Sequence, residues 1–372
     1  MDDKKLGFGM MRLPMTADGT KVDIPATCKV VDAFLERGFT YFDTAWMYCN
    51  FQSEDAVKEV LTKRYPREAF TLTTKLHSGF INTPEDRDKI FNTQREKTGL
   101  EYFDFYWLHD INSHSIEIYN RLDCFNWLIE KKKQGLVKHI GFSFHDGPEL
   151  LKAVLEAHPE MEYVQLQVNY LDWDSVSIRS RECYETAVSF GKKVIIMEPV
   201  RGGTLATVPE KAEKLFKDYS PDASVPSWAI RFAASHDNVY KVLSGMNTVE
   251  QVLDNTGYMK EFIPFNEEEF AIVEEAAKII NESVEIPCTG CKYCMPGCPM
   301  QIQIPKCFSL YNLDRQEVAT KGWTPQGQYY EYMTEFTGKA SSCIECRQCE
   351  NICPQHLPIT KYLKTVAAYF EK

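Results

Sequence analysis

Two cysteine runs near the C-terminus constrain the fold of this chain more than any other feature. Each run has the spacing Cys-x2-Cys-x2-Cys-x3-Cys-Pro. A tight turn with this spacing can wrap three thiolates around one [4Fe–4S] cluster and send the fourth thiolate to a second cluster. The spacing therefore predicts a module with two [4Fe–4S] clusters. Its ligands would be Cys288, Cys291, Cys294, Cys298, Cys343, Cys346, Cys349 and Cys353.

The same spacing predicts that each cluster takes ligands from both runs. One cluster would be held by the first three cysteines of the first run and Cys353, the other by the first three of the second run and Cys298. Because iron would then join the two ends of the module, metal binding should be coupled to its folding. Structural zinc and a secreted disulfide framework both fit this spacing poorly.

Composition excludes several classes of function. The chain has 372 residues, enough for two domains, and its 44% hydrophobic content is typical of a globular protein. A net charge of −11 argues against binding to nucleic acid, whose phosphates it would repel. The charged N-terminus resembles no signal peptide, and the apolar runs are too short to span a membrane. We therefore expect a cytoplasmic protein that binds neither nucleic acid nor membrane.

From Leu6 to about Tyr258, short β-branched or aromatic runs alternate with longer amphipathic segments. Seven or eight such units in this length favour an α/β fold of the closed (β/α)8 TIM-barrel type. The candidate strands are Tyr41–Asp43, Phe70–Lys75, Tyr102–His109, Val137–Phe142, Tyr163–Gln167, Lys193–Met197 and Tyr240–Ser244. The candidate helices are Ala26–Arg37, Ser53–Arg64, Pro84–Thr98, Glu117–Gln134 and Pro148–Ala157.

An open doubly wound sheet is the rival fold, but its Gly-x-Gly-x-x-Gly fingerprint is missing from the sequence. An acidic helix over about 266–283 would lead out of the barrel. We thus predict a barrel domain over residues 1–280 and an α-helical, ferredoxin-like iron–sulfur domain over residues 281–372.

Three strands of the expected barrel end in titratable residues. Asp43 ends the second strand, with Tyr48 in the loop that follows, Lys75 ends the third, and His109 ends the fourth. Active sites of such barrels form at the C-terminal ends of the strands, so these side chains should converge. An ammonium beside a phenol lowers the phenol's pKa, and a carboxylate keeps that ammonium charged. The set is suited to protonating an oxygen while a hydride reaches the adjacent carbon.

These residues lie in segments that resemble the three motifs of the aldo/keto reductase family, over approximately residues 6–260. The segments are Phe42–Tyr48, Thr73–Lys75 and Trp107–His109. The resemblance implies that Tyr48 is the general acid, that Lys75 lowers its pKa and that Asp43 holds the lysine. It also implies that His109 orients the substrate carbonyl. The C-terminal runs are similarly like those of bacterial two-cluster ferredoxins.

The resemblance also implies an extended nicotinamide cofactor, NADP(H) or NAD(H), across the barrel mouth. Phe144 stands where the family has an asparagine, and Met197 stands where it usually has a stacking tyrosine. The basic residues that commonly bind the 2′-phosphate are absent, which leaves the choice between the two nicotinamides open. The implied cofactor-binding residues are Arg12, Ser143, Gln167, Met197, Arg201, Gly202, Ser244, Gly245, Met246, Gln251 and Asn255.

The two parts of the chain leave more than one function open. We favour NAD(P)H-dependent interconversion of a small-molecule carbonyl and its alcohol, with the clusters in a structural, sensing or docking role. The alternative is an electron-transfer oxidoreductase in which the clusters feed a flavin or exchange electrons with a redox protein partner such as a ferredoxin. No flavin motif is found in the sequence. A non-catalytic carrier is disfavoured by the intact set of four residues.

Overall fold

The computed structural model of the chain describes residues 4–113, 115–174, 178–316, 325–335 and 337–371. It divides into two compact units. The first comprises Met1–Val208 and Leu215–Glu274, and the second comprises Pro209–Lys214 and Glu275–Lys372. The boundary between Glu274 and Glu275 lies inside helix α12 (Glu267–Ser283). The predicted domain boundary at residue 280 lies in the same helix.

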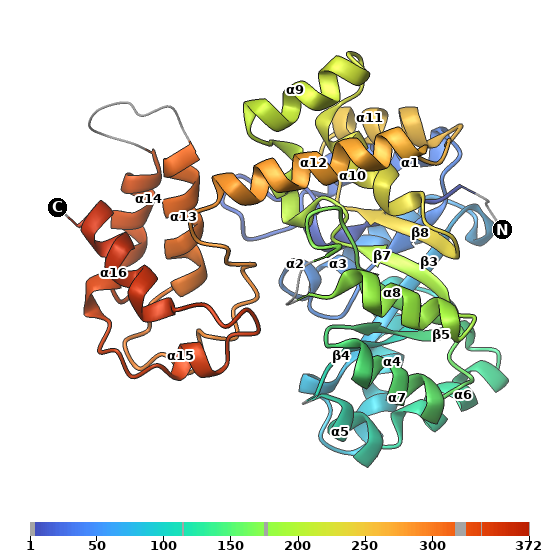
Figure 1. Ribbon diagram of the computed structural model, residues 1–372. Coiled ribbons are helices and arrows are strands. Elements are labelled where there is room, and N and C mark those ends of the chain that lie inside the picture. The colour runs from blue at the N-terminus through green and yellow to red at the C-terminus, as the bar shows by residue number, and fades with distance from the viewer. Residues whose placement is uncertain (1–3, 114, 175–177, 317–324, 336, 372) are drawn as a thin grey trace. The chain divides into compact units, whose positions relative to one another are not determined.

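The first unit is a closed barrel of eight parallel strands in sequence order, with β8 paired to β1. Helices follow the strands and cover the outside of the barrel (Figure 1). The predicted α/β fold of the (β/α)8 type is therefore confirmed. The strands are β1 (Leu6–Gly9), β2 (Tyr41–Asp43), β3 (Thr71–His77), β4 (Phe103–Ile111), β5 (Val137–Phe144), β6 (Tyr163–Gln167), β7 (Lys193–Met197) and β8 (Val239–Ser244).

The helices of this part begin and end where the local chemistry dictates. For example, the helix that starts at Pro84 has a capping box formed by Thr83 and Asp86 and ends at Gly99, whose φ is 70°. The helices are α1 (Ile24–Glu36), α2 (Tyr48–Phe51), α3 (Ser53–Val57), α4 (Pro84–Thr98), α5 (Ser115–Arg121), α6 (Cys124–Lys133), α7 (Pro148–Ala157), α8 (Ser180–Ser189), α9 (Glu210–Tyr219), α10 (Val225–Ala234), α11 (Val249–Met259) and α12.

Two predicted helices are wrong in detail. The single helix expected over Glu117–Gln134 is two helices, α5 and α6, because Asp123 adopts a left-handed conformation with φ 51° that interrupts the α-helical path. The helix expected over Ser53–Arg64 is α-helical only as α3 and continues as a π-helical turn over Lys58–Thr62. Strand β1 was not among the candidate strands.

The strand register brings the predicted catalytic positions together by a stagger. Asp43 pairs with Thr73, and Lys75 pairs with Trp107. Each predicted catalytic residue thus lies two residues further along its strand than the partner of the one before. A shift of two keeps the side chains on the same face of the sheet, and it follows the tilt of strands in a closed barrel.

The barrel interior below these residues is a packed core. Aromatic rings dominate it and meet edge to face, as in Tyr41 against Phe105, or at a tilt, as in Trp107 against Tyr163. This plug gives the mouth a rigid floor. Its members are Tyr41, Phe105, Trp107, Tyr163, Ile195 and Leu243, with Tyr240 packed against them.

The second unit is built from short helices around its own hydrophobic core. Its helices are α13 (Ile304–Gln316), α14 (Pro325–Thr334), α15 (Gln348–Asn351) and α16 (Ile359–Phe370). The core residues include Cys307, Phe308, Tyr311, Tyr330, Leu363 and Val366. The predicted α-helical character of the C-terminal part is therefore confirmed.

Candidate active site and candidate metal centre

Lys75 and Asp43 form a buried ion pair at the barrel mouth. Lys75 Nζ lies 2.5 Å from Asp43 Oδ1 and donates to the Thr44 carbonyl oxygen at 2.8 Å. Neither side chain has appreciable exposure. Burial alone would lower the pKa of Lys75, but the Asp43 carboxylate and the Tyr48 phenol raise it above its usual value. The lysine is therefore a fixed positive charge.

The Tyr48 hydroxyl lies 3.4 Å from Lys75 Nζ, at the start of helix α2. Burial raises the pKa of Tyr48, and the Lys75 ammonium opposes that rise without cancelling it. The expectation that the lysine lowers the pKa thus holds only relative to burial alone. At neutral pH the phenol keeps its proton, and Lys75 is placed to stabilise the phenolate once the proton has left.

His109 faces Tyr48 across the mouth. The two rings meet edge to face with centroids 5.9 Å apart. Burial, and then the positive charge of Lys75, hold the pKa of His109 well below its usual value. The imidazole is therefore neutral and can donate one N–H to an oxygen. Lys75 and His109 were predicted to end their strands. This is wrong by two residues, because β3 continues to His77 and β4 to Ile111.

A second layer of buried polar side chains supports Lys75, and sequence reasoning missed it. Glu54 is fully buried and accepts hydrogen bonds from Thr74 Oγ1 and Gln94 Nε2, both at 2.7 Å. The same Gln94 nitrogen donates to the Lys75 carbonyl oxygen at 2.9 Å. The Tyr106 hydroxyl donates to Gln94 Oε1 at 2.5 Å. This network fixes the β3 backbone under the lysine. No spacing in the sequence signals it, because its members come from four separate elements, α3, β3, α4 and β4.

Two predicted cofactor residues lie at the ends of β5 and β6. Ser143 is buried, and its hydroxyl oxygen accepts the Asp110 N–H at 2.7 Å. Gln167 donates its side-chain nitrogen to Asp172 Oδ2 at 2.9 Å, and Asn169 donates to the same oxygen at 2.9 Å. Asp172, which sequence reasoning missed, therefore positions the predicted nicotinamide-contacting amide.

The loop after β7 forms ion pairs with the loop after β6 and with the loop after β1. Arg201 lies 3.3 Å from Asp172, and Arg12 lies 3.7 Å from Glu198. Gly202 has φ 67°, and a Cβ there would lie 3.4 Å from Arg12 Nη2. The guanidinium thus lies directly against the glycine backbone. Met197 ends β7 and is partly exposed.

The predicted adenosine-side residues gather at β8 and α11. Asn255 Nδ2 donates to Ser244 Oγ at 3.0 Å, and Asn255 Oδ1 accepts from Tyr258. Gln251 accepts the Asn247 N–H at 2.8 Å. Both amides therefore have partners within the protein and hold the loop that follows β8. Met246 is buried, and Gly245 packs against the Arg12 side chain.

These residues fit a nicotinamide dinucleotide. Gly202 and Gly245 both lie against the Arg12 side chain, and Arg201 precedes Gly202 in the chain. Arginine charge and close backbone approach at glycine both suit a pyrophosphate. A side chain at Gly202 would narrow this approach. When the dinucleotide is bound, Arg12, Arg201 and the backbone around Gly202 and Gly245 would hold its phosphates.

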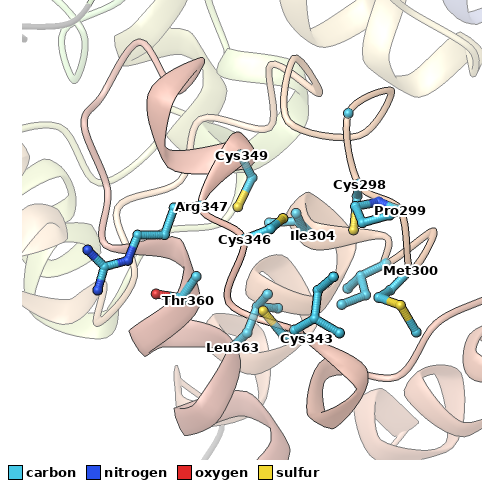
Figure 2. Close-up of a pocket in the computed structure, with 13 residues that line it drawn as sticks. Cys298, Pro299, Met300, Ile304, Cys343, Cys346, Arg347, Cys349, Thr360 and Leu363 are labelled. Carbon is cyan, nitrogen blue, oxygen red and sulfur yellow. The ribbon is translucent and has the colours of Figure 1, made fainter.

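The eight cysteines of the two runs line two hollows of the C-terminal unit. Cys288, Cys291, Cys294 and Cys353 line the first hollow. Cys298, Cys343, Cys346 and Cys349 line the second hollow, and Figure 2 shows their sulfur atoms around a common space. Each hollow takes three cysteines from one run and the last cysteine of the other. The four cysteine side chains in each hollow therefore fit a [4Fe–4S] cluster, whose ligands are four cysteines.

The duplication of the runs extends to the backbone. Within the described part of residues 284–371, the residues with positive φ fall into three pairs at equivalent positions of the two runs. The pairs are Gly290 with Glu345, Lys292 with Arg347, and Gln301 with His356. Left-handed turns are costly for residues other than glycine and asparagine, so their repetition indicates that the cysteine geometry requires them.

The five remaining cysteines lie outside both hollows. Cys124 and Cys183 are buried on helices, as predicted, and burial raises the pKa of each thiol to about 12. Cys49 follows Tyr48 and is partly buried, with its sulfur 3.4 Å from the Met11 carbonyl oxygen. Burial raises the pKa of the Cys49 thiol as well, which makes it a poor nucleophile.

Comparisons with known proteins match two separate parts of the chain. The model of the aldo/keto reductase family matches residues 5–278, and that of the 4Fe-4S dicluster domain matches residues 287–357. An uncharacterized oxidoreductase of Schizosaccharomyces pombe is 24% identical over 288 residues. This alignment covers 74% of this chain and 87% of that protein.

Solved structures of similar fold cover the barrel part. The holo form of an aldo-keto reductase from Bacillus halodurans has a TM-score of 0.58 and 23% identity, covering 73% of this chain and 91% of its own. An aldo-keto reductase from Klebsiella pneumoniae in complex with NADPH has a TM-score of 0.58 and 16% identity. The match covers 74% of this chain and 95% of that one. At these identities the likeness shows the fold alone. Across the described residues, no helix has the length and apolar character needed to cross a membrane.

Proposed function

The chain belongs to the aldo/keto reductase family, and we propose that it interconverts a small-molecule carbonyl and its alcohol with NADP(H) or NAD(H). The observation that carries the proposal is the geometry around Lys75. This buried ammonium is paired with Asp43 at 2.5 Å and lies 3.4 Å from the Tyr48 hydroxyl, and the His109 ring packs edge to face with the Tyr48 ring. The solved Klebsiella pneumoniae relative with NADPH supports the choice of cofactor.

When bound, a nicotinamide would supply the hydride for the carbonyl carbon in the reducing direction. The neutral His109 donates an N–H to the carbonyl oxygen and orients it. As the C=O π electrons move to oxygen, Tyr48 donates its phenolic proton to that oxygen. The phenolate left behind is stabilised by the Lys75 ammonium, which Asp43 keeps charged. In the oxidising direction the phenolate takes the alcohol proton back.

Substitution of Tyr48 tests this assignment. We expect Tyr48→Phe to lower kcat/KM for aldehyde reduction by about 10²–10⁴-fold, the usual contribution of a general acid. Iron content and nicotinamide binding, measured by fluorescence, should not change. Tyr102→Phe is a matched control, since the Tyr102 hydroxyl accepts from Lys138. Tyr102 comes before β4, away from Asp43, Lys75 and His109 at the other ends of their strands. Unchanged turnover in the Tyr48 variant would contradict the general-acid role.

We also propose that the C-terminal part holds two [4Fe–4S] clusters, each bound by one of the two hollows. The set of four cysteines in each hollow supports this. A cluster takes up one electron at a time, whereas a hydride carries two electrons together. We therefore infer that the clusters take no part in the hydride transfer. They would serve folding, redox sensing or docking of a redox protein.

A further inference from the structure

The two cysteine-lined hollows are built from residues at equivalent positions of the two runs, so each hollow is a reference for the other. Lys292 of the first hollow and Arg347 of the second each follow the second cysteine of a run. Thr289 and Ile344 each follow the first cysteine. Because both hollows have a cationic residue at the same position, a difference between the clusters would arise at the positions where a polar residue faces an apolar one.

Gln355 of the first hollow corresponds to Met300 of the second, because each follows the Cys-Pro end of a run. The two turns at these ends match. The N–H groups of His356 and Gln301 each donate to the carbonyl oxygen of the last cysteine of their run, both at 3.0 Å. The proline inside each turn fixes its own φ as well. Matching turns thus place a glutamine in one hollow where the other has a methionine.

The amide of Gln355 lacks an acceptor. Its nitrogen, Nε2, is buried and has no hydrogen-bond partner among the described residues. Burial of an N–H without an acceptor is unfavourable, so such a group indicates an acceptor that the polypeptide does not supply. Met300, at the equivalent place in the second hollow (Figure 2), has a thioether and no N–H to donate.

The polar side chains of the second hollow are directed elsewhere. The Thr360 hydroxyl donates to Glu350 Oε1 at 2.7 Å. The Arg347 side chain is 70% exposed, and its guanidinium points away from the sulfur atoms of the four cysteines (Figure 2). The described lining of the second hollow therefore has no counterpart of the Gln355 amide.

Reduction of a cluster brings in one electron from an external one-electron donor and adds one negative charge. An N–H that donates to a cluster sulfur stabilises the reduced form more than the oxidised form, and this raises the reduction potential. We propose that Gln355 Nε2 donates a hydrogen bond to a sulfur atom of the cluster in the first hollow, and that this cluster takes up the first electron. The inference rests on the proposed pair of clusters.

Exchange of the two residues tests the inference. An anaerobic redox titration of the holoenzyme with viologen mediators, read by electron paramagnetic resonance, follows each cluster separately. The signal missing in Cys288→Ser identifies the cluster of the first hollow. At a fixed potential, Gln355→Met should lower the ratio of reduced to oxidised first cluster about tenfold, which is about 59 mV for one electron. The ratio for the second cluster should change less than about twofold. Met300→Gln should raise the ratio for the second cluster about tenfold.

Gln348→Met is the matched control, because it removes the same amide beside Cys349 from an exposed residue that lines neither hollow. It should change neither ratio. Unchanged ratios in Gln355→Met, or equal changes for both clusters, would overturn the inference and leave the proposed pair of clusters standing. If Gln355→Met loses iron, an unchanged second cluster in Met300→Gln would overturn the inference instead. Wild-type protein with only one cluster signal would overturn both proposals.

Discussion

The barrel site and the cysteine module achieve their geometry in opposite ways. In the barrel, Lys75 and Asp43 satisfy each other's charge, and a second layer around Glu54 and Gln94 holds the strand beneath them. In the module, four cysteines line each hollow, and left-handed residues such as Glu345 and Arg347 form the turns between them. The protein alone completes the first site, whereas the second needs iron.

The two sites therefore differ in what stabilises them. A buried ion pair with hydrogen bonds to fixed neighbours persists without a ligand, because the low-dielectric surroundings strengthen the attraction. Left-handed turns at residues other than glycine raise the free energy of the folded module, so another interaction must offset that cost. In the module, the metal–thiolate bonds would do so, which couples its folding to iron.

The largest expected effect comes from removing iron. Anaerobic treatment with a chelator and an oxidant should raise amide hydrogen exchange in residues 285–371 by about 100-fold or more, because folding free energy is lost with the metal. Exchange in the strands of the barrel should stay within about twofold. Exchange mass spectrometry of holo and apo protein measures both regions at once. Equal loosening of β3 and β4 would break the contrast between the sites.

The smallest expected effect comes from relieving strain in one turn. Glu345 has φ 56° where the first run has Gly290, with φ 70°. We expect Glu345→Gly to stabilise the holo module by about 1 kcal/mol, and Gly290→Ala to destabilise it by a similar amount. Denaturant unfolding monitored by cluster absorbance measures both changes. Equal and same-signed effects of the two substitutions would show that the two turns do not have the same role.

The fold was largely predictable because its signals are local. The strands Tyr163–Gln167 and Lys193–Met197 were predicted with the bounds they have. The first alternates apolar residues with glutamine, and the second is a short apolar run after a lysine, and both patterns are local. The cysteine sets also follow from spacing alone, and the hollows group them as predicted. The convergence of Asp43, Lys75 and His109 required only knowing that strand ends meet at a barrel mouth.

The rest depends on contacts between residues far apart in sequence. The left-handed conformations of Asp110 and Asp123 were not predicted, because aspartate adopts that conformation more often than most residues but at few of its positions. From sequence alone, Glu54 would be assigned to the exposed face of an amphipathic helix. Its burial follows from hydrogen bonds to Thr74 and Gln94, which are distant in sequence. The net pKa of Tyr48 likewise depends on burial that a motif does not reveal.

Crossed ligation, in which iron joins the two cysteine runs, is tested most directly at Cys353. We compare Cys353→Ser with Cys349→Ser, two substitutions in the same run whose side chains line different hollows. Electron paramagnetic resonance of the reduced proteins should show each variant losing a different cluster signal, with the Cys353 variant matching Cys288→Ser. Loss of the same signal in the Cys353 and Cys349 variants would contradict crossed ligation.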